Sequence, residues 1–300
     1  MLDKLEFMIA LDRERHFGRA AERCGVAQPT LSIGIQNLEE MFNVALVKRS
    51  SRFQGFTPEG ERMLVWARRL VGDARAMRQD ILGLSKEPES QLRIAAIPSA
   101  MPFVARLTMP FQVKHPKVRI TVLSRSSNTL LNLLHQREID AGVTYLSNEP
   151  IGDVNATPLY REEYLLLTTP RGPFGRADHV TWAEAGAVPL CLLERDLQNR
   201  RIIDSVLRRT GSEPTPMMET DSILALISYV RLGHCASIVP SSAVESVDLT
   251  DDLHAIPLVE PQIHHTIGLV VSERFPIQPA LAALMDHARA LSPQSLLPAA

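Results

Sequence analysis

Residues 1–57 show the apolar spacing of short, closely packed helices. Apolar positions recur at helical intervals over residues 2–9 and again over 17–24, where Ala20-Ala21 allows close packing. A third helix is predicted over Gln28–Phe42, because its apolar residues advance by four, three and four positions at Leu31, Ile35, Leu38 and Phe42. Gly25 suits the turn before it. Two helices joined by such a turn indicate a helix-turn-helix.

A short, basic stretch follows. Residues 46–56 are β-like in composition, and Gly55 is a turn residue, which together favour a wing of two short strands that carries Lys48, Arg49 and Arg52. Thr57-Pro58 then has the form of a helix start, with Thr57 as the N-cap and proline in the first position.

The next segment has a heptad pattern. Small or apolar residues step alternately by four and three, at Met63, Ala67, Leu70, Ala74, Met77, Ile81 and Leu84. This spacing predicts a long linker helix with a coiled-coil seam for dimerisation. An amphipathic helix packed on its own domain is the alternative. The polar, proline-containing residues 86–90 end the helix.

Residues 91–300 alternate strand-like and helix-like runs. Strands are predicted at 92–97, 118–123 and 139–143, with helices between them, and this order favours a mostly parallel sheet. Further strand candidates lie at 165–169, 188–193, 236–239 and 266–271. The remaining length fits two α/β lobes.

Composition changes this picture little. The formal net charge is −2, and eight basic minus seven acidic residues leave only +1 for residues 1–57, so charge alone does not reveal a nucleic-acid partner. The three cysteines form no CxxC pattern and fit a reducing cytoplasm. We expect no secretory signal at the N-terminus and no membrane helix.

The N-terminal residues resemble the LysR-type transcriptional regulators. Matching positions recur at fixed offsets across the first domain, at Ala20-Ala21, Gln28-Pro29, Leu31-Ser32, Ile35, Leu38-Glu39-Glu40, Arg49, Thr57 and Gly60. The C-terminal runs HPKVRITV, REIDAGV and YVRLGHCASIVP resemble the family more loosely.

The resemblance implies an α/β protein with an N-terminal all-α winged helix-turn-helix, a long linker helix and a two-lobed effector domain like that of periplasmic binding proteins. We expect a DNA-binding domain at 1–58, a dimerising linker helix and hinge at 59–89, and an effector domain at 90–300. Lobe one would take about 90–160 and 266–300, and lobe two about 161–265.

DNA contacts are expected from the start of the third helix and from the wing. The candidates are Arg19, Gln28, Pro29, Thr30, Ser32, Ile33, Gln36, Arg49 and Arg52. Two positions depart from the family: Ala27 replaces the usual serine cap, and Ile33 replaces an arginine. Ile33 would offer a thymine methyl an apolar contact. Family habit further implies a dimer of dimers on promoter DNA, in the cytoplasm with the nucleoid, with RNA polymerase as a further partner.

Effector contacts are expected at the ends of strands, where helix N-termini and hydroxyls face the cleft. The candidates are Ser99, Ala100, Met101, Thr129, Thr144, Arg200, Thr220 and Ser222, with Arg201 as the alternative counter-charge. For each hydroxyl the other interpretation is a helix cap. A small anion is the expected effector, and no cofactor is implied.

Other functions fit the sequence less well. The sequence has no G-x-S-x-G, HExxH or P-loop motif, so we expect no enzyme. His264-His265 would point to opposite faces of a strand, which argues against a metal site. A solute-binding protein conflicts with the N-terminal domain. A redox-sensing regulator of the same family, using Cys191 and Cys235, stays open, although both cysteines lie in apolar strand contexts.

Overall fold

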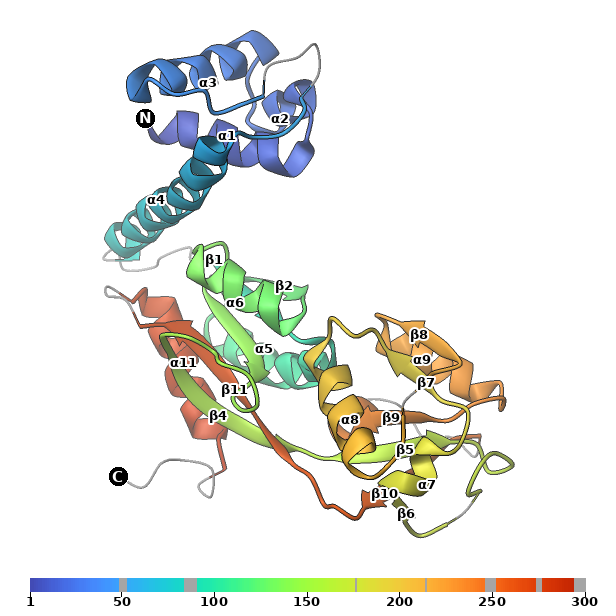
Figure 1. Cartoon of the computed structure of the whole chain (residues 1–300). Helices are drawn as coiled ribbons and strands as arrows, with labels where there is room; N and C mark the ends of the chain where they lie inside the picture. Colours follow the sequence, from blue (N-terminus) through green and yellow to red (C-terminus); the bar gives the residue numbers. More distant parts are fainter. Residues whose placement is uncertain are drawn as a thin grey trace. The chain divides into compact units, whose positions relative to one another are not determined.

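The computed structural model describes residues 1–48, 53–83, 91–175, 177–213, 215–245, 252–273 and 277–293. Arg49 and Arg52 of the predicted wing, Leu84 and most of the predicted hinge lie outside these ranges. Backbone contacts divide the chain into two units (Figure 1), one of Met1–Pro88 with His135–Glu138 and one of the remaining residues.

The N-terminal unit begins with the predicted helices. These are α1 (Leu2–Glu14), α2 (Phe17–Arg23) and α3 (Gln28–Phe42). Their shared core contains the apolar positions that the helical spacing selected, among them Leu5, Met8, Ala20, Leu31 and Leu38. Gly25, with a φ of 67°, makes the turn between α2 and α3, as expected of a residue without a Cβ.

The wing and the next helix are tied together by backbone contacts. Val47 and Phe56 form an antiparallel bridge, and Thr57 N donates to Leu46 O at 3.0 Å. Thr57 caps α4 (Pro58–Gly83), because its Oγ1 accepts from Gly60 N at 3.0 Å. A Cβ on Gly60 would lie 2.0 Å from Leu46 O, so only glycine lets α4 approach the wing this closely.

Helix α4 has apolar residues on two faces. Leu64, Ala67 and Val71 are buried in the core of the N-terminal unit, and Met63 packs against that core. The prediction for Ala67 therefore needs correction, because it is 0% exposed within a single chain, whereas Met63 is half-buried against the same core. The outward face instead carries exposed Trp66, Leu70, Met77 and Ile81.

The first lobe of the C-terminal unit is built on a sheet with the order β2-β1-β3-β11-β4. Its strands are β1 (Gln91–Ala96), β2 (Arg119–Ser124), β3 (Ala141–Tyr145), β4 (Val154–Glu162) and β11 (His265–Ser272). The helices are η1 (Pro98–Ala100), α5 (Met101–Lys114), α6 (Ser127–His135) and α11 (Pro279–Leu291). Strands β1, β2 and β3 are parallel, as predicted.

The second lobe has a sheet with the order β6-β10-β5-β9, beside the pair β7-β8. Its strands are β5 (Tyr164–Thr168), β6 (Val180–Thr181), β7 (Cys191–Leu193), β8 (Met218–Thr220), β9 (Ser237–Pro240) and β10 (His254–Val259). The helices are α7 (Trp182–Gly186), α8 (Gln198–Arg209), α9 (Ile223–Arg231) and α10 (Ser241–Glu245).

The chain passes between the lobes from β4 to β5 and returns from β10 to β11 (Figure 1). Because β4 and β11 carry the chain in opposite directions, they pair antiparallel, and β11 also pairs antiparallel with β3. In the second lobe β5 pairs antiparallel with β9 and β10. The prediction of mostly parallel pairing therefore holds for β1–β3, for β6 with β10 and for β7 with β8, whereas β4, β5, β9 and β11 pair only antiparallel. Among the residues described, no helix combines the length and apolar character needed to cross a bilayer.

Candidate functional site

Helix α3 presents one polar face to solvent. Gln28, Pro29, Thr30, Ile33 and Gln36 are exposed, Ile33 to 55%, and Ser32 is half-buried. The opposite side packs into the core through Leu31, Gly34, Ile35 and Leu38. Ala27 at the N-cap of α3 makes no side-chain hydrogen bond, as expected of an alanine in place of serine. The first half of α3 therefore offers amide, hydroxyl and apolar groups together, which are the groups that read base edges in a major groove.

Arg19 lies on α2 and is exposed, but it is not free. Its guanidinium donates to Glu14 O at 2.8 Å and lies 3.8 Å from the Glu14 carboxylate. Arg23 pairs with the same carboxylate at 3.2 Å. Both pairs are exposed, so a phosphate can replace them at low cost.

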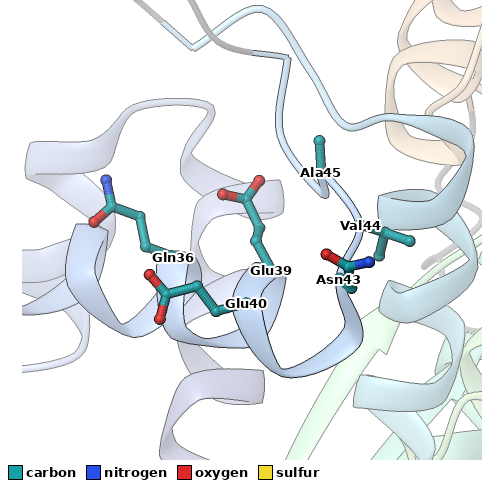
Figure 2. A pocket seen from close by; sticks show the side chains of 6 residues that line it. All are labelled: Gln36, Glu39, Glu40, Asn43, Val44 and Ala45. Carbon is teal, nitrogen blue, oxygen red and sulfur yellow. The ribbon is translucent and has the colours of Figure 1, made fainter.

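The far end of α3 borders a hollow of about 570 Å³ (Figure 2). Gln36 and Glu40 extend from the helix on one side of it, and Asn43, Val44 and Ala45 follow the helix end. Glu39 also lines the hollow, and its carboxylate accepts from Leu46 N at 2.8 Å, which fixes the first wing strand. A carboxylate such as that of Glu40 repels phosphate and can accept from a base amino group.

A small cavity lies between the two lobes. Its walls come from the ends of β1 and β3, the starts of η1 and α6, and the segment from β7 into α8; they consist of Ile97, Pro98, Ser99, Ser127, Tyr145, Leu193, Leu197, Gln198 and Asn199. Only about 10 Å³ is open to water, room for about one molecule. The cleft is therefore closed.

Interlobe contacts keep α8 over the cavity. Asn199 Nδ2 donates to the Tyr145 hydroxyl at 3.2 Å, and Gln198 Nε2 donates to Ser147 O at 3.2 Å. Arg201 makes a bidentate pair with Glu149 at 2.7 and 2.8 Å, and these hydrogen bonds raise the pKa of Arg201. Opening the cleft requires these contacts to break.

Several helices begin at the wall of the cavity. The η1–α5 segment begins at Pro98, α6 at Ser127 and α8 at Gln198, and all of these residues line the cavity. The backbone amides at such ends carry partial positive charge and bind anions. Within the part of the chain that the structure describes, the buried Asn199 Oδ1 has no hydrogen-bond partner, which leaves an unsatisfied acceptor on a residue of the largely apolar cavity wall.

The structure separates the predicted effector residues of the first lobe. Ser99 lines the cavity, and Ala100 is buried behind it. Met101 is half-buried against the core. Thr144 is buried and donates to Ser127 Oγ at 3.2 Å, one step from the cavity. Thr129 is exposed and bonds Ser126 at 3.0 Å. The hydroxyl of α6 that faces the cavity belongs to Ser127.

The second-lobe predictions largely fall outside the cavity. Arg200 is 0% exposed and bonds Asp204 at 2.6 Å, Leu193 O at 2.7 Å and Glu219 at 2.6 Å, so it joins α8 to the β7-β8 pair. Thr220 Oγ1 accepts from Ser222 N, and Ser222 Oγ accepts from Ala225 N. Both hydroxyls therefore act as turn and helix caps, and neither lines the cavity.

Sequence reasoning missed several residues of this region. Tyr145, Gln198 and Asn199 line the cavity, and Glu162 lies fully buried where β4 ends. The available signal for Tyr145 was its position one residue past Thr144, at the end of β3. Nothing local marked Glu162, because only the fold shows that the strand end is buried.

The carboxyl of Glu162 has hydroxyl and amide partners. It accepts from Ser242 N at 3.2 Å, Ser242 Oγ at 2.8 Å, Ser241 Oγ at 3.3 Å and the Tyr160 hydroxyl at 3.3 Å. Burial raises the pKa of Glu162 to about 7, and the hydrogen bonds from Ser242 limit that rise. Burial, and then Glu162 itself, raises the pKa of Tyr145 to about 12.

Family models cover most of this chain. Residues 2–61 match the bacterial regulatory helix-turn-helix protein, lysR family, and residues 85–292 match the LysR substrate binding domain. The chain belongs to the LysR family. It is therefore a DNA-binding transcriptional regulator with an effector-binding domain, and it carries the winged helix-turn-helix and two-lobed fold that the sequence resemblance predicted.

Individual LysR-family proteins match over nearly the whole length. The DNA-binding transcriptional dual regulator OxyR of Escherichia coli is 26% identical over 287 residues, covering 95% of this chain and 94% of OxyR. A full-length OxyR variant from Pseudomonas aeruginosa has a TM-score of 0.74 at 25% identity, covering 96% of this chain and 97% of that one. The LysR-family regulator CbnR shares the fold, with a TM-score of 0.73 at 19% identity, covering 98% and 100% of the chains.

The cysteines of the second lobe are buried in its core. Cys191 and Cys235 both belong to one apolar cluster. Burial, and then the neighbouring Cys235, raises the pKa of Cys191 to about 11, and burial raises the pKa of Cys235. A thiol reacts as its thiolate, so both groups are poor nucleophiles near neutral pH.

We expect a maleimide to label native protein at half-buried Cys24 well before Cys191 or Cys235, because the latter two are covered. Peptide mass spectrometry over time measures each rate. In urea the three sites should react at similar rates, which is the control. Rapid native labelling of Cys191 or Cys235 would show that the second-lobe core opens easily.

Proposed function

We propose that this LysR-family protein reads promoter DNA with the exposed face of α3 and adjusts its activity to a small anionic molecule in the interlobe cleft. The observation that carries the first part is the exposed face of Gln28–Gln36, whose opposite side packs into the core through Leu31, Ile35 and Leu38. A helix supported in this way can enter the major groove without rearranging its core.

Each exposed group on α3 has a matching base feature. Gln28 and Gln36 can bond adenine through two atoms each, Ser32 and Thr30 can bond bases or phosphates, and Ile33 can contact a thymine methyl. Arg19, with Arg49 and Arg52 of the wing, would contact the phosphate backbone. Such contacts hold the protein in register, and the base contacts specify sequence. A promoter-binding protein works where the chromosome lies, so we expect it with the nucleoid in the cytoplasm.

Dimerisation would use the outward face of α4. Leu70, Met77 and Ile81 are exposed and step by seven and four, which is heptad spacing, and exposed Trp66 lies one turn before Leu70 on the same side of the helix. An apolar face of this kind fits a second copy of α4, with Ala74 also on it. The pair would bring two copies of α3 to two half-sites of a roughly palindromic operator. Two such dimers would form a tetramer, with RNA polymerase as the next partner at the promoter.

The groups around the cleft are the reason for proposing an anionic effector. Amides at the starts of η1–α5, α6 and α8 surround it, with the hydroxyls of Ser99 and Ser127 beside them. Because the cavity has room for about one water, an effector must first displace α8 and break the Arg201–Glu149 pair. Effector binding would thus select a lobe arrangement different from the closed one, which is the two-state behaviour that allosteric control requires.

Redox sensing is the second candidate, because several relatives carry the name hydrogen peroxide-inducible genes activator. For this chain it would rest on Cys191 and Cys235. Their burial and raised pKa values count against it. DNA binding that responds to a thiol-blocking reagent in wild type, but not with Cys191→Ser and Cys235→Ser together, would favour this candidate.

Gln28→Ala should weaken binding to the protein's own upstream region about tenfold, the worth of one bidentate base contact. Ser32→Arg should abolish or re-target binding, because a long side chain enters the groove. Gel-shift titration and footprinting measure both. Glu22→Ala, exposed on α2, is the matched control and should bind normally. Unchanged affinity and footprint for Gln28→Ala and Ser32→Arg would place the reading helix elsewhere.

Leu70→Glu combined with Met77→Glu should yield folded monomers by light scattering, because two charges per chain enter the apolar α4 seam. Arg75→Ala with Arg78→Ala alters exposed polar positions of the same helix and should keep the assembly intact. If the glutamate variant keeps its mass in solution, the copies associate through another surface.

Sulfate should raise the melting temperature of wild type more than sodium chloride of equal ionic strength does, because a bound anion stabilises the native state. Ser127→Ala should reduce this difference, since Ser127 lines the cavity. Thr129→Ala removes an exposed hydroxyl from the same turn of α6 and should leave the difference intact. Equal effects of the two variants would argue against an anion at the α6 N-terminus.

A further inference from the structure

Glu162 occupies the passage between the lobes. It is the last residue of β4, and β5 begins two residues later at Tyr164. Its side chain is 0% exposed and lies at the start of α10, which directly follows β9 of the second lobe. The Ser242 hydroxyl on α10 also reaches Ser99 O of the first lobe at 3.0 Å. One short chain of groups therefore joins Glu162 to the cavity wall.

The protonation state of Glu162 decides which hydrogen bonds the Ser242 hydroxyl can make. Ser242 Oγ lies 2.8 Å from Glu162 Oε2 and 3.0 Å from Ser99 O, but a serine hydroxyl has one proton to donate. If Glu162 is ionised, both neighbours of Ser242 Oγ are acceptors and one goes without a donor. If Glu162 is protonated, its own proton goes to Ser242 Oγ and the serine proton goes to Ser99 O. Only the protonated form satisfies both contacts.

The groups around Glu162 leave it in a neutral, hydroxyl-rich environment. Those that face it or flank it are Tyr145 on β3, Tyr160 and Arg161 on β4, Glu163, Tyr164 on β5, Ser241, Ser242 and Glu245 on α10, and His265 on β11. Arg161 and Glu163 are exposed, and Glu245 pairs at the surface with Arg106. His265 is the backbone partner of Glu162, and its ring lies edge-on to Tyr145 and Tyr164.

The titration of these groups agrees with the geometry. Burial raises the pKa of Glu162 to about 7, so its carboxyl gains and loses a proton near neutral pH. Burial, and then His264, lowers the pKa of His265, which favours the neutral ring. Burial also raises the pKa values of Tyr160 and Tyr164, which therefore remain protonated donors.

We infer that Glu162 is a proton-controlled positioning residue: when protonated it leaves the Ser242 hydroxyl on the Ser99 carbonyl, and when ionised it withdraws that hydroxyl from the cavity wall. The inference deepens the proposed function and rests on it where the effector is concerned, because Ser99 lines the proposed anion cleft. The cleft would then respond to proton binding at Glu162 as well as to the anion.

The sign of the coupling follows from charge. An anion in the cleft lies near Ser99 and Tyr145, and its field opposes ionisation of Glu162. Anion binding should therefore be accompanied by proton uptake, and by linkage the affinity for the anion should fall as the pH rises through the titration of Glu162. The regulator would respond to an anion more strongly in acid than in alkaline conditions.

The first test needs no effector. Hydrogen–deuterium exchange of the full-length protein is followed in peptides covering residues 97–101 at about pH 6 and about pH 8, either side of the Glu162 titration, and each rate is divided by the intrinsic rate. In wild type we expect protection of this segment to fall about fivefold at the higher pH, the effect of losing one ordinary hydrogen bond.

Variants separate the link from a general pH effect. Glu162→Gln keeps the shape of the neutral acid and can still donate to Ser242, so protection should stay high at both pH values. Ser242→Ala removes the shared hydroxyl, so protection should be low at both. Ser241→Ala loses a bond to Glu162 but none to Ser99, so its protection should still fall with pH, with the midpoint moved to a higher pH than in wild type. The inference would be overturned if protection of residues 97–101 in wild type were the same at both pH values, or if it still changed with pH in Glu162→Gln.

Sulfate provides the second test, because it does not titrate in this range. Calorimetry in two buffers of different ionisation enthalpy should show proton uptake on binding, with affinity about tenfold weaker at about pH 8 than at about pH 6. Glu162→Gln should show neither effect. Sulfate binding without proton uptake would overturn the coupling. Absence of sulfate binding at both pH values would count against the anion cleft itself, and the exchange experiment would still decide the role of Glu162.

Discussion

A polar group taken out of water needs a partner inside the protein, and the passage between the lobes is built around one such group. Strand β4 delivers Glu162 to a fully buried position, and the start of α10 supplies the donors that meet it. Those donors directly follow β9, whereas Ser99 belongs to the turn after β1. Meeting the needs of one carboxyl therefore fixes the second lobe against the cavity wall of the first.

The elements that sequence predicted best are those decided by local spacing. Helix α3 occupies Gln28–Phe42 as predicted, because Leu31, Ile35 and Leu38 can share one core only on a helix. Thr57 caps α4 as predicted, because a hydroxyl before a proline has few other favourable arrangements. The exposed polar face of α3 follows from the same periodicity, so the spacing that predicts the helix also selects the DNA-reading candidates.

The cleft residues were harder to predict because they depend on which way a helix turns. Ser127 and Thr129 are both hydroxyls in the first turn of α6, and two residues on a helix are rotated by about 200°, so only one can face the second lobe. Arg200 and Arg201 differ by about 100° on α8. One enters the core beside β7 and β8, and the other reaches Glu149 across the cleft. Periodicity identifies such faces but does not say what lies opposite each of them.

The close approach of α4 to the wing at Gly60 also has a genetic consequence. A Cβ there would meet a backbone oxygen of Leu46, and a backbone atom cannot move aside as a side chain can. Any base change at the first or second position of a glycine codon replaces glycine, so nearly every missense mutation of this codon would separate the wing from α4. Inactivating alleles should therefore accumulate at a residue that touches neither promoter nor effector.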